Sequence, residues 1–238
     1  MRLHRFFVEE MIPPYSDSRS GAQVQEFSVT NETLLNQWRN VLRMTDGDQA
    51  ILFDGSGSES LCVFVSLTKK NALLRVIETK KGLVPEREVT LYMALIKKDN
   101  FELVLEKATE IGVTKIIPVQ MDRSEKKGVN YERAQKIVRE AAEQSGRATV
   151  PTLGEIIDVN KIPDGVVVFE PRGEISAREY FNTHTNTPVA VCIGPEGGFT
   201  DDELASFHAR NMPIVSTGSQ ILRAETAAVV ALTLGLVN

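Results

Sequence analysis

From residue 88 onward, apolar segments alternate with amphipathic segments, and this alternation constrains the fold more than any other feature. Residues 89–96, 166–169 and 189–193 are almost wholly apolar, as strands buried on both faces of a sheet require. Residues 99–111 and 132–145 instead place apolar side chains at helical spacing. Strands of this kind connected through helices predict an α/β fold built on a parallel sheet.

Two helix starts in this region carry signals of their own. Asp99 is followed three residues later by Glu102, and Thr200 by Glu203. In such a pair the first side chain accepts from the helix backbone and the second reaches back to the residue before the helix, which is a capping box. A last helix is expected over residues 225–236, whose side chains are apolar nearly all round, so the core or a partner must cover it.

The first part of the chain predicts a small, mostly β domain over residues 1–77. Its expected strands are short, are joined in part by a Gly-rich turn, and cover residues 3–8, 49–53, 61–65 and 72–77. One helix is expected over residues 30–42, opened by Thr30 or Asn31 and with Val41 on its apolar face. Residues 78–87 are polar and contain Gly and Pro, which predicts a linker, and residues 88–238 form the second domain.

The composition excludes several classes of protein. The chain has 238 residues and a net charge of −5, so no overall basic field points to nucleic acid, although local patches could still bind it. Two cysteines and three histidines, without ligand spacing, predict neither a disulfide framework nor a metal site. The longest apolar run, residues 227–237, is too short to span a bilayer, and Glu9 and Glu10 rule out a signal peptide. We therefore expect a cytoplasmic protein with no membrane segment.

The most unusual string is I-G-P-E-G-G-F-T, residues 193–200, which follows directly on a predicted buried strand. Ligands of α/β sheets bind at such strand ends, and glycines let a backbone approach a ligand closely. The next helix begins with acidic residues, which occupy its positive end and disfavour a phosphate. The loop suits a phosphate-free ligand, such as a nucleoside with a cationic centre, although it would also suit a tight structural turn.

A second string, T-G-S-Q-I-L-R-A-E-T-A at residues 217–227, follows a short predicted strand and opens the last helix. Arg223 and Glu225 flank the start of that helix. A structural role is open to both, because Glu225 would complement the helix dipole and Arg223 would cap the carbonyl groups of a neighbour. The alternative is a role in a site, since this helix start is expected beside the glycine loop.

Four strings together resemble the RsmE family of ribosomal RNA small-subunit methyltransferases, which act on uridine N3. They are I-G-P-E-G-G at residues 193–198, I-L-R-A-E-T-A at 221–227, K-A-T-E-I-G-V at 107–113 and A-A-E-Q-S-G-R at 141–147. The opening M-R-L-H-R-F-F is also similar to that of the family. The likeness covers essentially the whole chain, in the same order, and the four strings together are specific.

The resemblance implies a PUA-like β-barrel over residues 1–77 and a SPOUT-type parallel-sheet methyltransferase domain over residues 88–238, with a C-terminal trefoil knot. It also implies that S-adenosylmethionine (SAM) binds in this knot. The residues matched to the cofactor site lie on three loops that follow strands: Phe169, Glu170, Pro171, Gly194, Pro195, Glu196, Gly197, Gly198, Thr217, Gly218, Ile221, Leu222 and Thr226.

The implied reaction transfers a methyl group to N3 of a uridine in 16S ribosomal RNA, presented as naked RNA or in the assembled 30S subunit. The neutral imide nitrogen is a poor nucleophile, so a carboxylate must take its proton or a cation must stabilise the imide anion. We expect Arg223 to be that cation and Glu196 to be the base, with Glu225 as the alternative base. The reaction needs no metal.

Basic residues near chain ends and loops are candidate phosphate contacts, with a solvated side chain as the alternative for each. They are Arg2, His4, Arg5, Arg19, Arg123, Lys126 and Arg147.

The resemblance also favours a homodimer, in which a partner covers the last helix. Two other functions stay open, a SPOUT methyltransferase for a tRNA ribose 2′-hydroxyl and a non-catalytic RNA-binding assembly factor. The PUA-like start and the I-L-R-A-E-T-A string argue against the first, and the intact glycine loop argues against the second.

Overall fold

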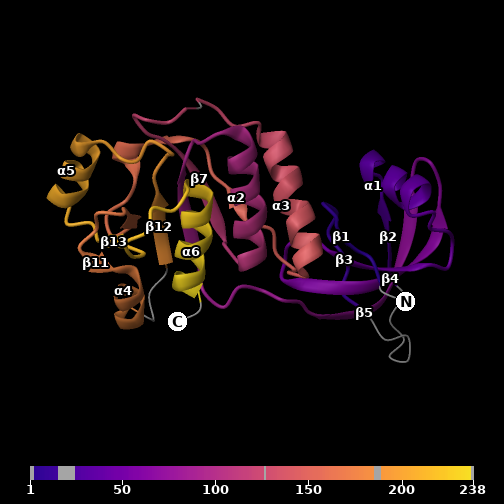
Figure 1. The fold of residues 1–238 in the computed structure, drawn as a ribbon. Helices are drawn as coiled ribbons and strands as arrows, with labels where there is room; N and C mark the ends of the chain where they lie inside the picture. Colours follow the sequence, from indigo (N-terminus) through magenta and orange to yellow (C-terminus); the bar gives the residue numbers. More distant parts are fainter. Residues whose placement is uncertain (1–2, 16–24, 126, 185–188, 237–238) are drawn as a thin grey trace. The chain divides into compact units, whose positions relative to one another are not determined.

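The computed structural model describes residues 3–15, 25–125, 127–184 and 189–236 (Figure 1). The chain forms two compact units. The first contains Met1–Val84 and Ala142–Thr149, and the second contains Pro85–Ala141 and Val150–Asn238. The first unit therefore includes a segment that is remote in sequence from its other residues, a return of the chain that the strand pattern did not predict.

The first unit is built on one sheet, whose strands are β1 Arg5–Phe7, β2 Glu26–Val29, β3 Gln49–Phe53, β4 Ser58–Leu67 and β5 Ala72–Lys81. Hydrogen bonds join them in the order β1-β3-β4-β5-β2. Strand β1 runs parallel to β3, and the other pairs are antiparallel. Because β5 continues through Lys81, residues 78–81 of the expected linker are part of this sheet.

The helical segment of the first unit begins as predicted and continues differently. Asn31 caps α1 (Glu32–Asn36) with its side chain. Helix α1 passes into a π-helical turn, η2 (Gln37–Val41). A π turn holds more residues than an α turn and changes which side chains face inward. Val41, expected in the core, is 68% exposed.

Aromatic side chains form the core of the first unit. Trp38 is fully buried and packs edge-on against Phe6 and Phe64, with ring centroids 5.5 and 5.1 Å away. Cys62 is buried beside them. Such contacts add to the free energy gained from burying the rings.

The second unit is built on a parallel sheet. Its strands in the described residues are β6 Val89–Ala94, β7 Lys115–Gln120, β8 Thr152–Leu153, β9 Ile157–Asp158, β10 Val167–Phe169, β11 Ile175–Ser176, β12 Val189–Ile193 and β13 Ile214–Ser216. The hydrogen-bonded order is β11-β13-β10-β12-β6-β7-β8, with β9 paired to β7. Every pair is parallel. The predicted α/β fold is confirmed, and the apolar runs form its central strands.

Strand β13 is flanked by two strands that precede it in sequence, β10 on one side and β11 on the other. The chain therefore returns between segments that it has already laid down. This insertion is what a threaded C-terminal segment would produce. The trefoil knot itself stays a prediction.

Helices cover this sheet (Figure 1). They are α2 Lys98–Ile111, α3 Tyr131–Ser145, α4 Ala177–Thr183, α5 Asp201–Ala209 and α6 Ala224–Leu236, with a short 3-10 helix, η3 Val159–Lys161. Helix α6 packs beside α2 and against β6 and β12, so the chain's own core covers much of it. The sequence pattern did not predict α4 or β11. None of these helices is both long and apolar enough to cross a membrane.

The start of α2 differs from the prediction. Asp99 does not cap the helix, which begins at Lys98 without a side-chain cap. Glu102 is instead paired with Arg133 on α3, with Oε1 2.5 Å from Nε. The hydrogen bond from Arg133 lowers the pKa of Glu102. The Glu102 carboxylate thus forms an ion pair between two helices, whereas the sequence pattern predicted that it would cap the start of α2.

Candidate active site

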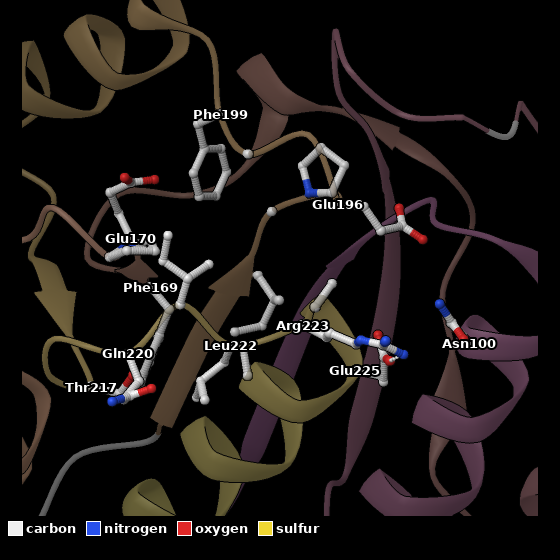
Figure 2. Close-up of a pocket in the computed structure, with 18 of the residues that line it drawn as sticks. Asn100, Phe169, Glu170, Glu196, Phe199, Thr217, Gln220, Leu222, Arg223 and Glu225 are labelled. Carbon is white, nitrogen blue, oxygen red and sulfur yellow. Dashed lines mark ion pairs between the residues drawn. The ribbon is translucent and has the colours of Figure 1, made fainter.

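A cavity of about 590 Å³ opens at the carboxyl ends of β10, β12 and β13 (Figure 2). Residues that follow each of these strands form its wall, together with the first turns of α2 and α6. Ligands of parallel α/β sheets bind at this edge, and the volume suits one small molecule. The glycine string and the I-L-R-A-E-T-A string therefore meet at one site.

The loop after β12 carries the glycine string. Phe199 fixes its end, because this ring is 2% exposed and meets the Phe207 ring edge-on at 5.4 Å between centroids. Gly194 packs on the same ring, where a Cβ would lie 3.0 Å from it. Gly198 has a φ of +69°, a conformation that favours glycine. Gly194 and Gly198 thus fit the shape of the loop and add no side chains to the cavity wall.

Helix α5 starts directly after this loop, and its own side chains satisfy its first turn. Thr200 Oγ1 accepts from the Glu203 N–H at 3.2 Å, and Glu203 Oε2 accepts from the Thr200 N–H at 2.7 Å. This is the predicted capping box. Asp201 and Asp202 add negative charge in the same turn. A phosphate group is therefore disfavoured at this helix start.

The loop after β10 brings a buried carboxylate to the cavity. Glu170 is 7% exposed, and its Oε1 accepts from Arg172 Nε at 2.9 Å. That hydrogen bond raises the pKa of Arg172. Gly173 lets the loop pass close to β13, since a Cβ on it would lie 2.6 Å from the carbonyl carbon of Val215. A larger residue at position 173 would displace the loop that carries Glu170.

The segment after β13, residues 217–223, forms the third part of the wall. Ser216 holds its start: the hydroxyl donates to the Pro171 carbonyl at 3.2 Å and accepts from the Gly218 N–H at 3.2 Å. Ile221 is 85% exposed, an apolar side chain on the cavity wall. Leu222 lies further in, where it is half-buried. This segment can therefore offer apolar contacts to a ligand.

Charged and polar side chains mark one end of the cavity (Figure 2). Arg223 Nη1 lies 4.0 Å from Glu225 Oε1, and the side chains are 85% and 12% exposed, respectively. Glu196 accepts at Oε1 from the backbone N–H of Lys97 at 3.1 Å. Asn100, in the first turn of α2, lines the same cavity. This end can thus donate and accept hydrogen bonds.

The chain matches two family models, an RNA methyltransferase domain over residues 84–235 and an RNA methyltransferase PUA domain over residues 39–77. It is similar to the ribosomal RNA small subunit methyltransferase E of Rickettsia conorii, at 34% identity with 92% of each chain covered. The protein of the same name from Bacillus subtilis is 32% identical, over 88% of this chain and 90% of that one. The chain belongs to the ribosomal RNA small subunit methyltransferase E family.

A solved structure of this family has the same fold. It is the crystal structure of a ribosomal RNA small subunit methyltransferase E from Neisseria gonorrhoeae bound to S-adenosyl methionine. The two sequences are 26% identical, and the structures superpose with a TM-score of 0.83 over 97% of this chain and 95% of that chain. This likeness and the PUA domain match confirm the expected fold class, a SPOUT-type methyltransferase preceded by a PUA-like domain.

Most residues that the family resemblance assigned to the cofactor line the cavity. They are Phe169, Glu170, Pro171, Gly194, Pro195, Glu196, Gly198, Thr217, Ile221 and Leu222. Gly197, Gly218 and Thr226 are not among the residues that line it. Arg223 and Glu196, both expected to be catalytic, line it as well. The fold therefore brings most of these residues together on one cavity, and their roles stay predictions.

Three polar residues of the wall were not singled out from the sequence: Lys97, Asn100 and Gln220. Lys97 and Asn100 follow β6, which pairs with β12 in the sheet. The carboxyl ends of adjacent parallel strands lie at the same edge of a sheet, so the residues that follow the apolar run 89–96 could have been expected at this edge. The sequence does not show that this strand pairs with residues 189–193, which is why Lys97 and Asn100 were not placed at the cavity.

Two basic residues of the first unit are less available to RNA than expected. Arg147 is 3% exposed, and burial lowers its pKa to about 10. Its guanidinium is therefore enclosed by protein rather than presented to a phosphate. Arg5 is paired with Glu59 and donates from Nη2 to the Gly146 carbonyl at 2.9 Å. His4 is exposed, as an RNA contact requires.

Arg123 is exposed but has a partner in its own unit. Its Nη1 donates to the carbonyl oxygens of Gly197 at 2.9 Å and Phe199 at 3.2 Å. The guanidinium thus binds the glycine loop, a contact that no local pattern predicted. Arg2, Arg19 and Lys126, also expected to contact RNA, lie outside the described residues.

The chemistry of the cavity comes from carboxylates, amides and cations. Cys192 is fully buried in β12, and burial raises the pKa of its thiol well above the ordinary value, so it is no nucleophile. In the part of the chain that the structure describes, no group of three or more His, Cys, Asp or Glu side chains is placed to hold a metal ion.

Proposed function

We propose that this protein transfers a methyl group from SAM to N3 of a uridine in the 16S ribosomal RNA of the small subunit. One observation carries the proposal. In this chain, a member of the methyltransferase family, the glycine loop and the Arg223–Glu225 pair lie on a single cavity at the carboxyl edge of the parallel sheet. The activity belongs in the cytoplasm, where small subunits are assembled.

The residues present fit SAM, a cation that carries no phosphate. The cavity wall has three carboxylates, Glu170, Glu196 and Glu225, and two cationic side chains, Lys97 and Arg223. An excess of negative charge favours a sulfonium ligand. The capped start of α5 disfavours a phosphate-bearing cofactor. The loops after β10, β12 and β13 would hold SAM, chiefly through their backbone groups and the apolar Leu222.

SAM supplies an activated methyl group, and the protein's residues supply orientation and charge. The loops around the cavity fix one reactant and exclude water, which lowers the entropic cost of the reaction. Arg223 presents a planar fork of donors to a uracil oxygen, where negative charge develops as the N3 proton leaves. A carboxylate takes that proton.

We also propose that the protein works as a homodimer. The face of α6 turned away from the sheet carries Thr226, Val229, Val230 and Thr233 at helical spacing. These residues are exposed or half-buried, and none is charged. An uncharged stripe of this kind suits contact with a second copy. Light scattering at micromolar concentration tests the proposal, and a monomer mass would contradict it.

Among the basic residues first proposed as RNA contacts, His4 keeps that proposed role. The surface it offers lies in the unit that matches the PUA domain model. Arg123 and Arg5 are proposed to act mainly within the protein, because both already hold carbonyl groups of their own chain. Arg147 is withdrawn as an RNA contact on account of its burial.

The proposal is tested with purified protein, SAM and three substrates: 30S subunits, naked 16S RNA and tRNA. Nucleoside mass spectrometry should find 3-methyluridine in the 16S RNA. A ribose-methylated nucleoside in tRNA would instead indicate the other type of SPOUT enzyme. Calorimetry with SAM alone separates an enzyme from a binding module, since a non-catalytic assembly factor would give no SAM binding.

A further inference from the structure

Three carboxylates line the cavity, and their surroundings differ. Glu170 is already bound to Arg172 at 2.9 Å. Glu196 is exposed, and its Oε1 accepts from the Lys97 N–H. Glu225 has a side chain only 12% exposed, and its Oε2 is buried without a hydrogen-bond partner among the described residues. A buried acceptor with no partner costs free energy, so a ligand that brings a donor to this carboxylate would be bound more tightly.

Glu225 could have a structural role instead of a role in the reaction. It lies in the first turn of α6, where a carboxylate complements the helix dipole. That role does not require burial, since an exposed carboxylate in the first turn interacts with the same dipole. It also leaves the unpaired Oε2 unexplained. A donor that the substrate brings to this carboxylate would supply a hydrogen bond that the described residues do not give to Oε2.

The neighbours of Glu225 match one chemical edge of uracil. The imide of uracil presents an N–H between two carbonyl oxygens, so its complement is an acceptor flanked by donors. Arg223 Nη1 lies 4.0 Å from the Glu225 carboxylate. Asn100, which can also donate, lines the cavity on the same side of the view (Figure 2). Cytosine has no N3 proton and would leave the Glu225 oxygen unpaired.

We infer that Glu225 is the base that takes the N3 proton of the target uridine, with Arg223 and Asn100 reading the flanking carbonyl oxygens. This inference rests on the proposed function. The N3 proton moves to the Glu225 carboxylate, the N3 lone pair forms the bond to the methyl carbon, and the bond from that carbon to the sulfonium sulfur breaks with its electron pair on sulfur. The same contacts select uridine over cytidine.

The test compares Glu225→Gln with Glu225→Asp and with Glu140→Gln, an exposed control on α3. Gln has the same shape as Glu but cannot take a proton. Methylation of 30S subunits by the Gln variant should fall at least about 100-fold. Asp keeps a carboxylate and should regain part of the rate, and the control should match wild type. SAM affinity, measured by calorimetry, and melting temperature should stay near wild-type values in all three variants.

A substrate with a more acidic N3 proton supplies a second readout. Particles are reconstituted from 16S RNA transcribed with uridine or with 5-fluorouridine, whose N3 proton leaves more readily. The rate deficit of Glu225→Gln should shrink about tenfold on the fluorinated RNA if the lost function is proton removal. A deficit equal on both RNAs would contradict the inference.

Other outcomes are equally decisive. If Glu225→Gln methylates near the wild-type rate, Glu225 has no role in the reaction. If the variant loses SAM affinity, Glu225 binds the cofactor, and if it unfolds, Glu225 supports the fold. Each of these results overturns the inference. If the wild-type protein itself forms no 3-methyluridine, the proposed function fails instead. The two failures are thus distinguished by the wild-type measurement.

Discussion

Arg123 Nη1 donates a hydrogen bond to the carbonyl oxygen of Gly197 at 2.9 Å, and so ties the turn after β7 to the glycine loop after β12. A second contact supports the same connection, because Glu203 Oε1 accepts from the Asp122 N–H at 3.0 Å. A Cβ on Gly197 would lie 3.3 Å from Arg123 Cβ. A side chain at position 197 would therefore crowd Arg123.

This relationship predicts a loss of cofactor affinity when Arg123 is removed. In Arg123→Ala the glycine loop loses both hydrogen bonds, and SAM affinity measured by calorimetry should fall about tenfold. Arg123→Lys should regain part of it. Lys127→Ala, an exposed cation nearby, should leave SAM affinity unchanged. Loss of 30S binding with normal SAM affinity in Arg123→Ala would show that this side chain binds RNA instead.

Gly198→Val should weaken SAM binding without unfolding the protein. The φ of Gly198 is +69°, which costs a β-branched residue roughly 1–2 kcal/mol, and the loop would shift to relieve the strain. Nothing lies within 4 Å of the added Cβ, so the fold has room for it. Gly128→Val, at an exposed glycine that also has room, is the control. Equal SAM affinities in a folded Gly198→Val would remove this loop from the site.

Arg223→Ala should lose methylation while keeping its fold and its SAM affinity. The side chain is 85% exposed, and its one ion pair in the described structure, with Glu225, is 4.0 Å long. Loss of a donor that stabilises developing charge costs about 3 kcal/mol, or roughly 100-fold in rate. Arg223→Lys should recover little, because an ammonium group lacks the planar fork. A collapsed melting temperature in Arg223→Ala would make the arginine structural.

The first unit should lose stability in acid through Glu59. Burial raises the pKa of Glu59, but hydrogen bonds from Arg5 and Lys80 outweigh it and hold the pKa below the ordinary value of 4.5. A lowered pKa in the folded state means that the stabilisation is present above about pH 4.5 and is lost as the pH falls through the folded-state value.

Glu59→Gln tests this contribution by thermal melts from pH 7 down to pH 3. The variant should lose roughly 1–3 kcal/mol at pH 7, because Arg5 then keeps its charge without its partner. The gap to wild type should narrow below about pH 4.5. Glu78→Gln on the exposed side of β5 should melt like wild type at every pH. A constant gap would show that proton binding at Glu59 does not matter.

The elements that the sequence predicted are those with strong local signals. The apolar run at residues 189–193 became β12 with the same bounds, and the Thr200–Glu203 box caps α5 as expected. This strand and this cap depend on neighbouring residues only, so a single sequence contains their signals. The position of the cavity was expected on a general rule, because ligands of parallel sheets bind at strand ends.

The features that were missed depend on partners remote in the chain. Glu102 prefers Arg133 on another helix to a local cap, and Arg123 reaches the carbonyl of Gly197. Arg147 is buried because its segment returns to the first unit, where it meets Leu83. No pattern along the chain predicts these contacts between remote residues. In each case a tertiary contact replaces the role that the neighbouring residues suggested.

Nucleoside mass spectrometry of 16S RNA from cells that lack this gene tests the proposed methylation of uridine N3 in the cell. We expect 3-methyluridine to disappear from the small-subunit RNA, to return when the wild-type gene is supplied, and not to return with Glu225→Gln. Persistence of 3-methyluridine in the deletion strain, with a modified nucleoside lost from tRNA instead, would contradict the proposal.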